Sequence, residues 1–223
     1  MIMNHLYSFR RCPYAMRART GLHLSNLNPE VREIILKNKP AEMLAISPKG
    51  TVPVLVYSDQ VIAESLDIFQ FALKQYPQQN CPYLNKDQYQ TLIESLDSKD
   101  AKSLIQQNDV EFKPWLDKYK YADRHPEMSQ IAYRQQAELF IGNLEQQLSQ
   151  DAFLFANHPT FADYAIFPFI RQFAGVDPSW FASCPYPKVR AWLNSLIESE
   201  LFKQVMTKYP LWLDDKRTIH LKW

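Results

Sequence analysis

The chain changes its hydrophobic pattern once, and this change limits the folds that are open to it. Through Tyr76, short apolar segments alternate with helical patterns in the order β-α-β-α-β-β-α. The expected strands cover 2–7, 30–36, 52–57 and 60–63, and the expected helices cover 13–24, part of 37–50, and 65–76. The second strand follows the first through a helix, and such βαβ units pair their strands in parallel. The sequence therefore predicts an α/β domain built on a mixed sheet.

Beyond Pro82 the chain has the spacing of long helices. The expected helices cover 86–107, 127–149, 160–174 and 187–206. Segment 77–87, PQQNCPYLNKD, is polar, turn-forming and contains two prolines, so it is the natural boundary. We therefore expect an α/β domain over 1–77, a linker over 78–86 and an all-helical domain over 87–223. The aromatic residues of 208–223 suggest that this last segment packs back on the body of the protein.

Composition excludes several classes of function. The 25 Lys and Arg residues balance the 24 Asp and Glu residues, so there is no electrostatic case for nucleic acid or an anionic membrane as a partner. The N-terminal sequence lacks the pattern of a secretion signal, and no apolar run is long enough to span a membrane. Three dispersed cysteines form neither a disulfide framework nor a set of metal ligands. We expect a cytoplasmic protein that needs no metal.

Cys12 is the strongest candidate for chemistry. It precedes Pro13, a residue suited to the first turn of a helix, and therefore stands where that helix begins. Unpaired N–H groups and the positive end of the helix dipole favour a thiolate at such a position. The alternative is a small apolar residue that packs in the core. Cys81 and Cys184 also precede prolines but follow no strand, so we interpret them as structural.

Five segments in order along the chain resemble the glutathione transferase superfamily. They are CPYAMRAR, LKNKP, GTVPVL, AESLDI and PTFADYAIFPFI. The last begins with a capping-box pattern, Thr160 to Asp163, at the start of a helix. The resemblance implies a thioredoxin-like N-terminal domain followed by an all-α domain. The sequence of these segments is most similar to that of the cysteine-type members, which are the omega-class transferases and the large glutaredoxin with transferase architecture.

The same resemblance implies a binding site for glutathione as co-substrate. Val52 is expected to pair its backbone with the cysteinyl part of glutathione, next to a cis bond before Pro53. Glu64 and Ser65 are expected to hold the γ-glutamyl end, and Ser65 also suits the N-cap of the helix that follows. Lys39 corresponds to a lysine that meets the glycyl carboxylate, and Tyr14 lies beside the nucleophile.

The expected function is thiol transfer or reduction through a mixed disulfide between Cys12 and glutathione. Because residue 15 is alanine, this motif has no resolving cysteine, and the mechanism is monothiol. Two alternatives stay open: a conjugating transferase that uses Tyr7 or Ser8, and a binding or regulatory protein without turnover. The acceptor is a small electrophile, a disulfide or a mixed disulfide, held in a pocket of the helical domain. Relatives are usually homodimers, although monomers occur among the glutaredoxin-like ones.

Overall fold

The computed structural model describes residues 4–75 and 81–221 and divides the chain into two compact units. The first unit contains residues 1–86 together with 199–223, and the second contains 87–198. The division after Lys86 lies at the end of the predicted linker. The last segment, which we assigned to the helical domain, instead belongs to the first unit, because its side chains enter that unit's core.

The first unit has the predicted order of strands and helices. Its elements are β1 (His5–Ser8), α1 (Pro13–Leu24), β2 (Glu30–Glu33), α2 (Ala41–Ile46), β3 (Val54–Tyr57), β4 (Gln60–Ile62) and α3 (Ser65–Gln75). The sheet has the order β2-β1-β3-β4, with β1 parallel to β2 and the other pairs antiparallel. This arrangement confirms the thioredoxin-like domain with a mixed sheet. β2 ends at Glu33, earlier than predicted, because Ile35 bridges to Asn38 in a turn.

Successive residues of the strands supply two separate cores. Leu6 and Leu55 belong to a cluster with residues of α1 and α3, whereas Tyr7 and Val54 belong to a second cluster. This follows from the alternation of side chains across a strand. The second cluster also contains Met43 of α2 and Trp212. Each face of the sheet is therefore covered, and Phe9 and Cys12, which follow β1, pack against the second cluster.

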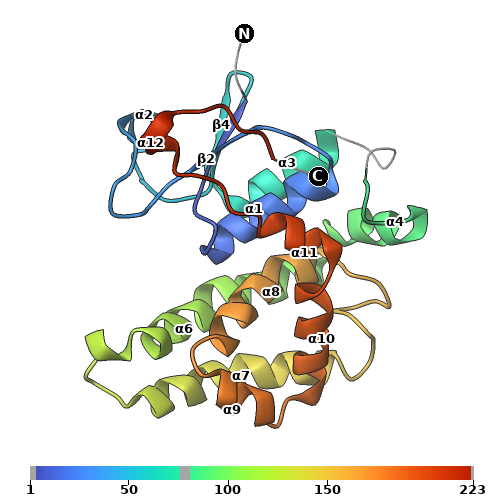
Figure 1. Cartoon of the computed structure of the whole chain (residues 1–223). Helices are drawn as coiled ribbons and strands as arrows, with labels where there is room; N and C mark the ends of the chain where they lie inside the picture. The colour runs from blue at the N-terminus through green and yellow to red at the C-terminus, as the bar shows by residue number, and fades with distance from the viewer. Residues whose placement is uncertain (1–3, 76–80, 222–223) are drawn as a thin grey trace. The chain divides into compact units, whose positions relative to one another are not determined.

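The C-terminal segment extends the first unit along the free edge of β2. It contains α11 (Glu200–Val205) and α12 (Trp212–Asp215), and Figure 1 shows α12, in red, beside α2. Val31 N donates to Ile219 O at 2.6 Å, and Leu221 N donates to Pro29 O at 3.2 Å. The expectation that this segment packs back on the protein is thus confirmed, and its backbone satisfies part of an exposed sheet edge.

Within the described residues, the regular elements of the second unit are all helices. Its elements are α4 (Lys86–Ser95), α5 (Lys99–Gln107), the π-helix η2 (Asn108–Phe112), α6 (Lys113–Lys120), the 3-10 helix η3 (Ala122–Arg124), α7 (Gln130–Gln147), α8 (Phe161–Ala174), α9 (Pro178–Ser183) and α10 (Pro187–Ile197). α8 contacts α5, α6 and α10. Figure 1 labels α6, α8 and α10. The predicted capping box is present at its start, where Asp163 Oδ2 accepts from Thr160 N at 2.7 Å. Burial raises the pKa of Asp163 to about 6.

Two predicted helices are each divided in the structure. The pattern over 86–107 forms α4 and α5, because Ser98 caps a new helix through its bond from Ala101 N at 3.2 Å. The pattern over 187–206 forms α10 and α11, because Ser199 caps α11 through its bond from Phe202 N at 3.1 Å. Both serines interrupt the helix without interrupting the hydrophobic spacing. The helices α6, α9 and α12 were not predicted from the sequence.

Candidate functional site

Cys12 stands at the N-cap of α1, as predicted. After β1 the backbone turns, and Cys12 N donates to Phe9 O at 2.9 Å. Cys12 has extended dihedral angles, φ −78° and ψ 124°, and its carbonyl oxygen accepts the first helical bond from Met16 N at 2.9 Å. Pro13 occupies the first turn. The half-buried thiol is therefore held at the positive end of the helix dipole, a position that favours a thiolate.

The structure brings Cys12 together with Val52 and Pro53. The thiol donates a weak hydrogen bond to Val52 O, with Sγ 3.8 Å from the oxygen. The peptide bond between Val52 and Pro53 is cis, which confirms that expectation. Val52 and Pro53 are buried, and β3 begins at the next residue. Backbone groups of the cis turn thus lie beside the thiol.

Glu64 and Ser65 lie where α3 begins, with roles that differ slightly from the prediction. Ser65 is the first residue of α3, and Glu64 is in the N-cap position because Ile68 N donates to Glu64 O at 3.0 Å. The Ser65 hydroxyl is buried and accepts a hydrogen bond from Arg17 Nη1 at 3.3 Å. Arg17 belongs to α1, so this bond joins the helix that carries the thiol to the start of α3.

The Glu64 carboxylate has an ion-pair partner that sequence reasoning missed. Lys49 Nζ lies 2.6 Å from Glu64 Oε1, and the two side chains are 59% and 61% exposed. A pair so exposed contributes only about 0–1 kcal/mol to stability. Lys39, the lysine that we predicted, is half-buried, and its Nζ would lie 3.6 Å from a Cβ added at Gly50. Lys39 and Lys49 therefore both lie close to the turn at residues 49–50, and the sequence pointed only to Lys39.

The alternative nucleophile positions, Tyr7 and Ser8, are both fully buried. The Tyr7 hydroxyl accepts a hydrogen bond from Arg32 Nη1 at 2.8 Å, and burial raises the pKa of Tyr7. Ser8 Oγ lacks a hydrogen-bond partner among the described residues. Tyr14, by contrast, is half-buried, and the Arg17 guanidinium carbon lies 5.5 Å from the centre of its ring. Of these three side chains, Tyr14 alone is open to solvent.

Sequence reasoning also missed the groups that hold these residues in place. Arg17 donates to the Ser65 hydroxyl, and Arg32 donates to the Tyr7 hydroxyl. The Glu33 carboxylate accepts from the backbone N–H of Arg10. Arg17 lies in the segment CPYAMRAR without a role of its own in the resemblance, and the other two residues lie in a strand without any motif. Contacts of this kind join residues far apart in the chain, so no local pattern marks them.

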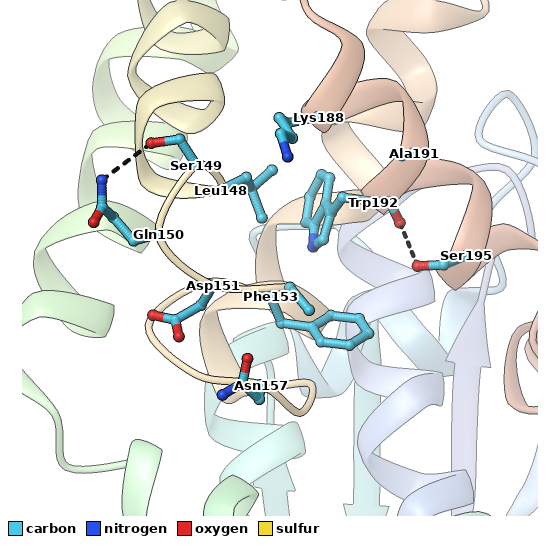
Figure 2. Close-up of a pocket in the computed structure, with 11 residues that line it drawn as sticks. Leu148, Ser149, Gln150, Asp151, Phe153, Asn157, Lys188, Ala191, Trp192 and Ser195 are labelled. Atoms are coloured by element: carbon cyan, nitrogen blue, oxygen red, sulfur yellow. Dashed lines mark hydrogen bonds between the residues drawn. The ribbon is translucent and has the colours of Figure 1, made fainter.

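A separate pocket of about 450 Å³ lies within the second unit. It is lined by residues 148–153, Asn157 and the face of α10 that carries Lys188, Trp192 and Ser195. Figure 2 shows the Trp192 ring near Leu148 and Lys188, with Phe153 on the side toward Asn157. Trp192 Nε1 donates to the buried Asp163 Oδ1 at 2.6 Å, which fixes this wall. None of the predicted site residues lines this pocket, and an acceptor pocket in this unit stays a prediction.

No helix in the ranges 4–75 and 81–221 is long and apolar enough to cross a membrane. The described residues contain no group of three or more His, Cys, Asp or Glu side chains placed to hold a metal ion.

Both units match models of one protein family. Residues 6–80 match the model described as glutathione S-transferase, N-terminal domain, and residues 114–195 match glutathione S-transferase, C-terminal domain. Glutathione S-transferase omega-1 of Mus musculus is 25% identical over 199 residues, which cover 86% of this chain and 75% of that protein. Glutathione S-transferase 1 of Dianthus caryophyllus is 39% identical over 85 residues, or 37% of this chain and 38% of that protein.

Solved structures share the fold at low sequence identity. The apo form of glutathione S-transferase III has a TM-score of 0.69 and 18% identity, with 93% of this chain and 99% of that chain covered. A glutathione transferase family member from Pseudomonas fluorescens, solved with two glutathione molecules bound, has a TM-score of 0.71 and 18% identity, with 92% of each chain covered. Together with the two family models and the omega-class relatives, this shared fold shows that the chain belongs to the glutathione S-transferase superfamily and has an omega-like relationship within it.

Proposed function

We propose that this protein is a glutathione-dependent thiol transferase in which Cys12 is the nucleophile. The observation that carries the proposal is the placement of the Cys12 thiol at the N-terminus of α1, 3.8 Å from Val52 O beside the cis bond. Glutathione is the co-substrate, as the family and the glutathione-bound relative from Pseudomonas fluorescens suggest. This chemistry fits the reducing cytoplasm, because regeneration of the Cys12 thiol requires a supply of reduced glutathione.

Glutathione would lie along the residues of the site in an extended conformation. Its cysteinyl backbone would pair with Val52, which places its sulfur next to Cys12. Its γ-glutamyl carboxylate would meet the N-terminus of α3 at Ser65, where the helix offers unpaired N–H groups. Its ammonium would meet Glu64 in competition with Lys49, and its glycyl carboxylate would meet Lys39. Replacing Lys49 by the ammonium group as the partner of Glu64 costs little free energy, because the Glu64–Lys49 pair is exposed to solvent.

The reaction proceeds in two thiol–disulfide exchanges. The Cys12 thiolate attacks the glutathionyl sulfur of a mixed disulfide, so a Cys12–glutathione disulfide forms and the acceptor leaves as a thiolate that takes up a proton. The thiolate of a second glutathione then attacks the glutathione sulfur bound to Cys12. This step releases oxidised glutathione and restores the Cys12 thiolate. Alanine at position 15 supports this route, since the motif has no internal thiol to compete with glutathione.

Burial of Tyr7 and Ser8 argues against the conjugating alternative. A hydroxyl that stabilises the glutathione thiolate must touch the ligand sulfur, and both side chains are 0% exposed. The Tyr7 hydroxyl already accepts a hydrogen bond from Arg32. Cys12, at the end of the loop that follows β1, is only half-buried. The binding-protein alternative predicts glutathione binding without turnover, or no binding at all.

Substitution of Cys12 tests the proposal. Cys12→Ala is expected to lower the rate of thiol transfer from a small mixed disulfide by at least about 100-fold, because it removes the attacking sulfur. Cys81→Ala is the matched control, since Cys81 is also half-buried and also precedes a proline, and it should keep the wild-type rate. Mass spectrometry should find glutathione attached to Cys12 after treatment with oxidised glutathione.

The other outcomes separate the alternatives. Thiol transfer that persists in Cys12→Ala contradicts the proposal. Conjugation of glutathione to an aryl halide, measured in parallel, would support the transferase alternative if it survives the same substitution. A wild-type protein that binds no glutathione at millimolar concentration would support the regulatory alternative.

A further inference from the structure

Glu33 ends β2 at the level where the loop to Cys12 begins. Its partner across the parallel pair is Ser8, the last residue of β1, and Ile34 N donates to Ser8 O at 2.9 Å. The Glu33 residue is only 7% exposed. A carboxylate so deeply buried is costly unless it receives hydrogen bonds or lies near an opposite charge. Its contacts therefore show what it stabilises.

One Glu33 oxygen holds the backbone of the loop that precedes the thiol. Glu33 Oε1 accepts a hydrogen bond from the backbone N–H of Arg10 at 2.6 Å. The same loop closes on itself through the bond from Cys12 N to Phe9 O at 2.9 Å. A hydrogen bond to an ionised carboxylate is roughly twice as strong as one between neutral groups. The turn of residues 9–12 is thus fixed at its start by Glu33 and at its end by its own backbone.

The second Glu33 oxygen faces α1, the helix that begins at the thiol. Arg19 Nη1 lies 3.8 Å from Glu33 Oε2, a charge contact too long for a hydrogen bond. Arg19 is fully buried, and its Nη2 donates to Thr207 O at 3.0 Å. Burial raises the pKa of Glu33, while the Arg10 amide and the Arg19 charge oppose that rise. The carboxylate therefore connects β2 with the chain on both sides of Cys12.

We propose that Glu33 is a positioning residue for the Cys12 thiol. Its carboxylate holds the turn of residues 9–12 in the conformation that directs Sγ toward Val52 O. The kinetic consequence rests on the proposed function, because it requires Cys12 to be the nucleophile. The hydrogen bond of Glu33 with Arg10 and its charge contact with Arg19 involve neither Val52 nor Ser65. Loss of the carboxylate should therefore affect the attack by sulfur more than the binding of glutathione.

Three variants separate positioning from stability. Glu33→Met keeps a side chain of similar length but removes both oxygens. Glu33→Gln keeps an oxygen that can accept from Arg10 N, but it replaces the other oxygen with an NH2 group and removes the charge. Glu30→Met is the matched control, because Glu30 is also a buried carboxylate of β2, 2% exposed, and pairs with Arg32 at the opposite end of the strand. All three are compared with wild type by thermal unfolding and by steady-state thiol transfer.

Glu33→Met is expected to lower kcat about 10-fold or more, since a small displacement of a nucleophile is costly in rate. KM for glutathione should stay within about 2-fold, because the residues that bind it are unchanged. Glu33→Gln should recover kcat to within about 3-fold of wild type, and Glu30→Met should leave kcat in that range despite a lower Tm. A wild-type kcat in Glu33→Met overturns the proposal. An equal fall of kcat in Glu30→Met also overturns it, since the effect would then be one of stability.

Hydrogen exchange tests the position of the loop independently of any activity. The Arg10 amide should exchange faster in Glu33→Met than in wild type, whereas Glu30→Met should leave it protected. If Cys12→Ala retained thiol transfer while this difference in exchange was present, the proposed function would fail and the structural role of Glu33 would stand. If the Arg10 amide were equally protected in all variants, the positioning role itself would be wrong.

Discussion

Tyr7 and Cys12 flank the same short loop, yet the fold places their side chains in different surroundings. The Tyr7 ring lies within the core cluster that covers one face of the sheet, edge-on to Trp212 with ring centres 5.9 Å apart. Cys12 only packs against the edge of that cluster. Tyr7 lies within β1, where helices and the C-terminal segment cover both faces of the sheet, whereas Cys12 stands half-buried at the N-cap, after the loop and before α1 begins. Under the proposed function, accessibility rather than residue type therefore decides which of the two side chains reacts.

Tyr7→Phe tests this distinction at the scale of one atom. The change leaves Arg32 Nη1, 2.8 Å from the lost oxygen, without that acceptor. We expect the free energy of unfolding to fall by about 1–2 kcal/mol, while the rate of thiol transfer stays at the wild-type value. Urea denaturation and the mixed-disulfide assay measure the two quantities. A marked loss of activity with unchanged stability would show that the Tyr7 hydroxyl takes part in the reaction.

Helix packing determines what the two interior glycines do. An ideal Cβ at Gly21 of α1 would lie 2.6 Å from Phe69 Cα of α3, so the absence of a side chain permits close contact between these helices. Gly142 of α7 has nothing within 4 Å of the same position. Both residues are poor helix formers, and the sequence alone treats them alike. The difference comes from a partner helix that is far away in the chain.

Gly21→Ala and Gly142→Ala should therefore shift stability in opposite directions. The first forces α1 and α3 apart and is expected to cost about 1–3 kcal/mol, as other overpacked cores do. The second replaces a poor helix former where the new methyl group meets no other atom, and it is expected to raise the free energy of unfolding by about 0.5–1 kcal/mol. Thermal and urea denaturation of the two variants check both signs. Equal effects in the two variants would contradict the close approach of the helices.

At the scale of the whole molecule, the main feature is that the first unit combines an N-terminal and a C-terminal segment of the chain. Its core includes Tyr209, Trp212 and Leu221 beside residues of β1, β2 and β3. The guanidinium carbon of Arg32 lies 4.4 Å from the centre of the Trp212 ring, and Lys216 Nζ lies 2.9 Å from Glu42 Oε1 of α2. The α/β unit is thus completed only when the last residues have been added to it.

Trp212→Ala should consequently damage the thiol site from a distance. We expect a loss of about 3–5 kcal/mol in the free energy of unfolding, because a buried indole is removed beside Tyr7 and Arg32. Binding of glutathione should weaken as well, since Val52 shares the cluster with Trp212. Trp115→Ala, in the second unit, is the control. Calorimetry with and without glutathione measures both effects. Wild-type affinity for glutathione in Trp212→Ala would contradict the influence of the C-terminal segment on the thiol site.

The sequence by itself determined the order β-α-β-α-β-β-α, the helical second half, the start of α1 directly after Cys12 and the capping box of α8. These depend on hydrophobic spacing and on residues such as Pro13 and Asp163 that act within a few positions of themselves. The tertiary structure alone decided the rest: the ion pair of Glu64 with Lys49, the bond from Arg10 to Glu33, and the membership of 199–223 in the first unit. Each of these joins segments distant in the chain, so each exists only after the sheet and its helices have packed.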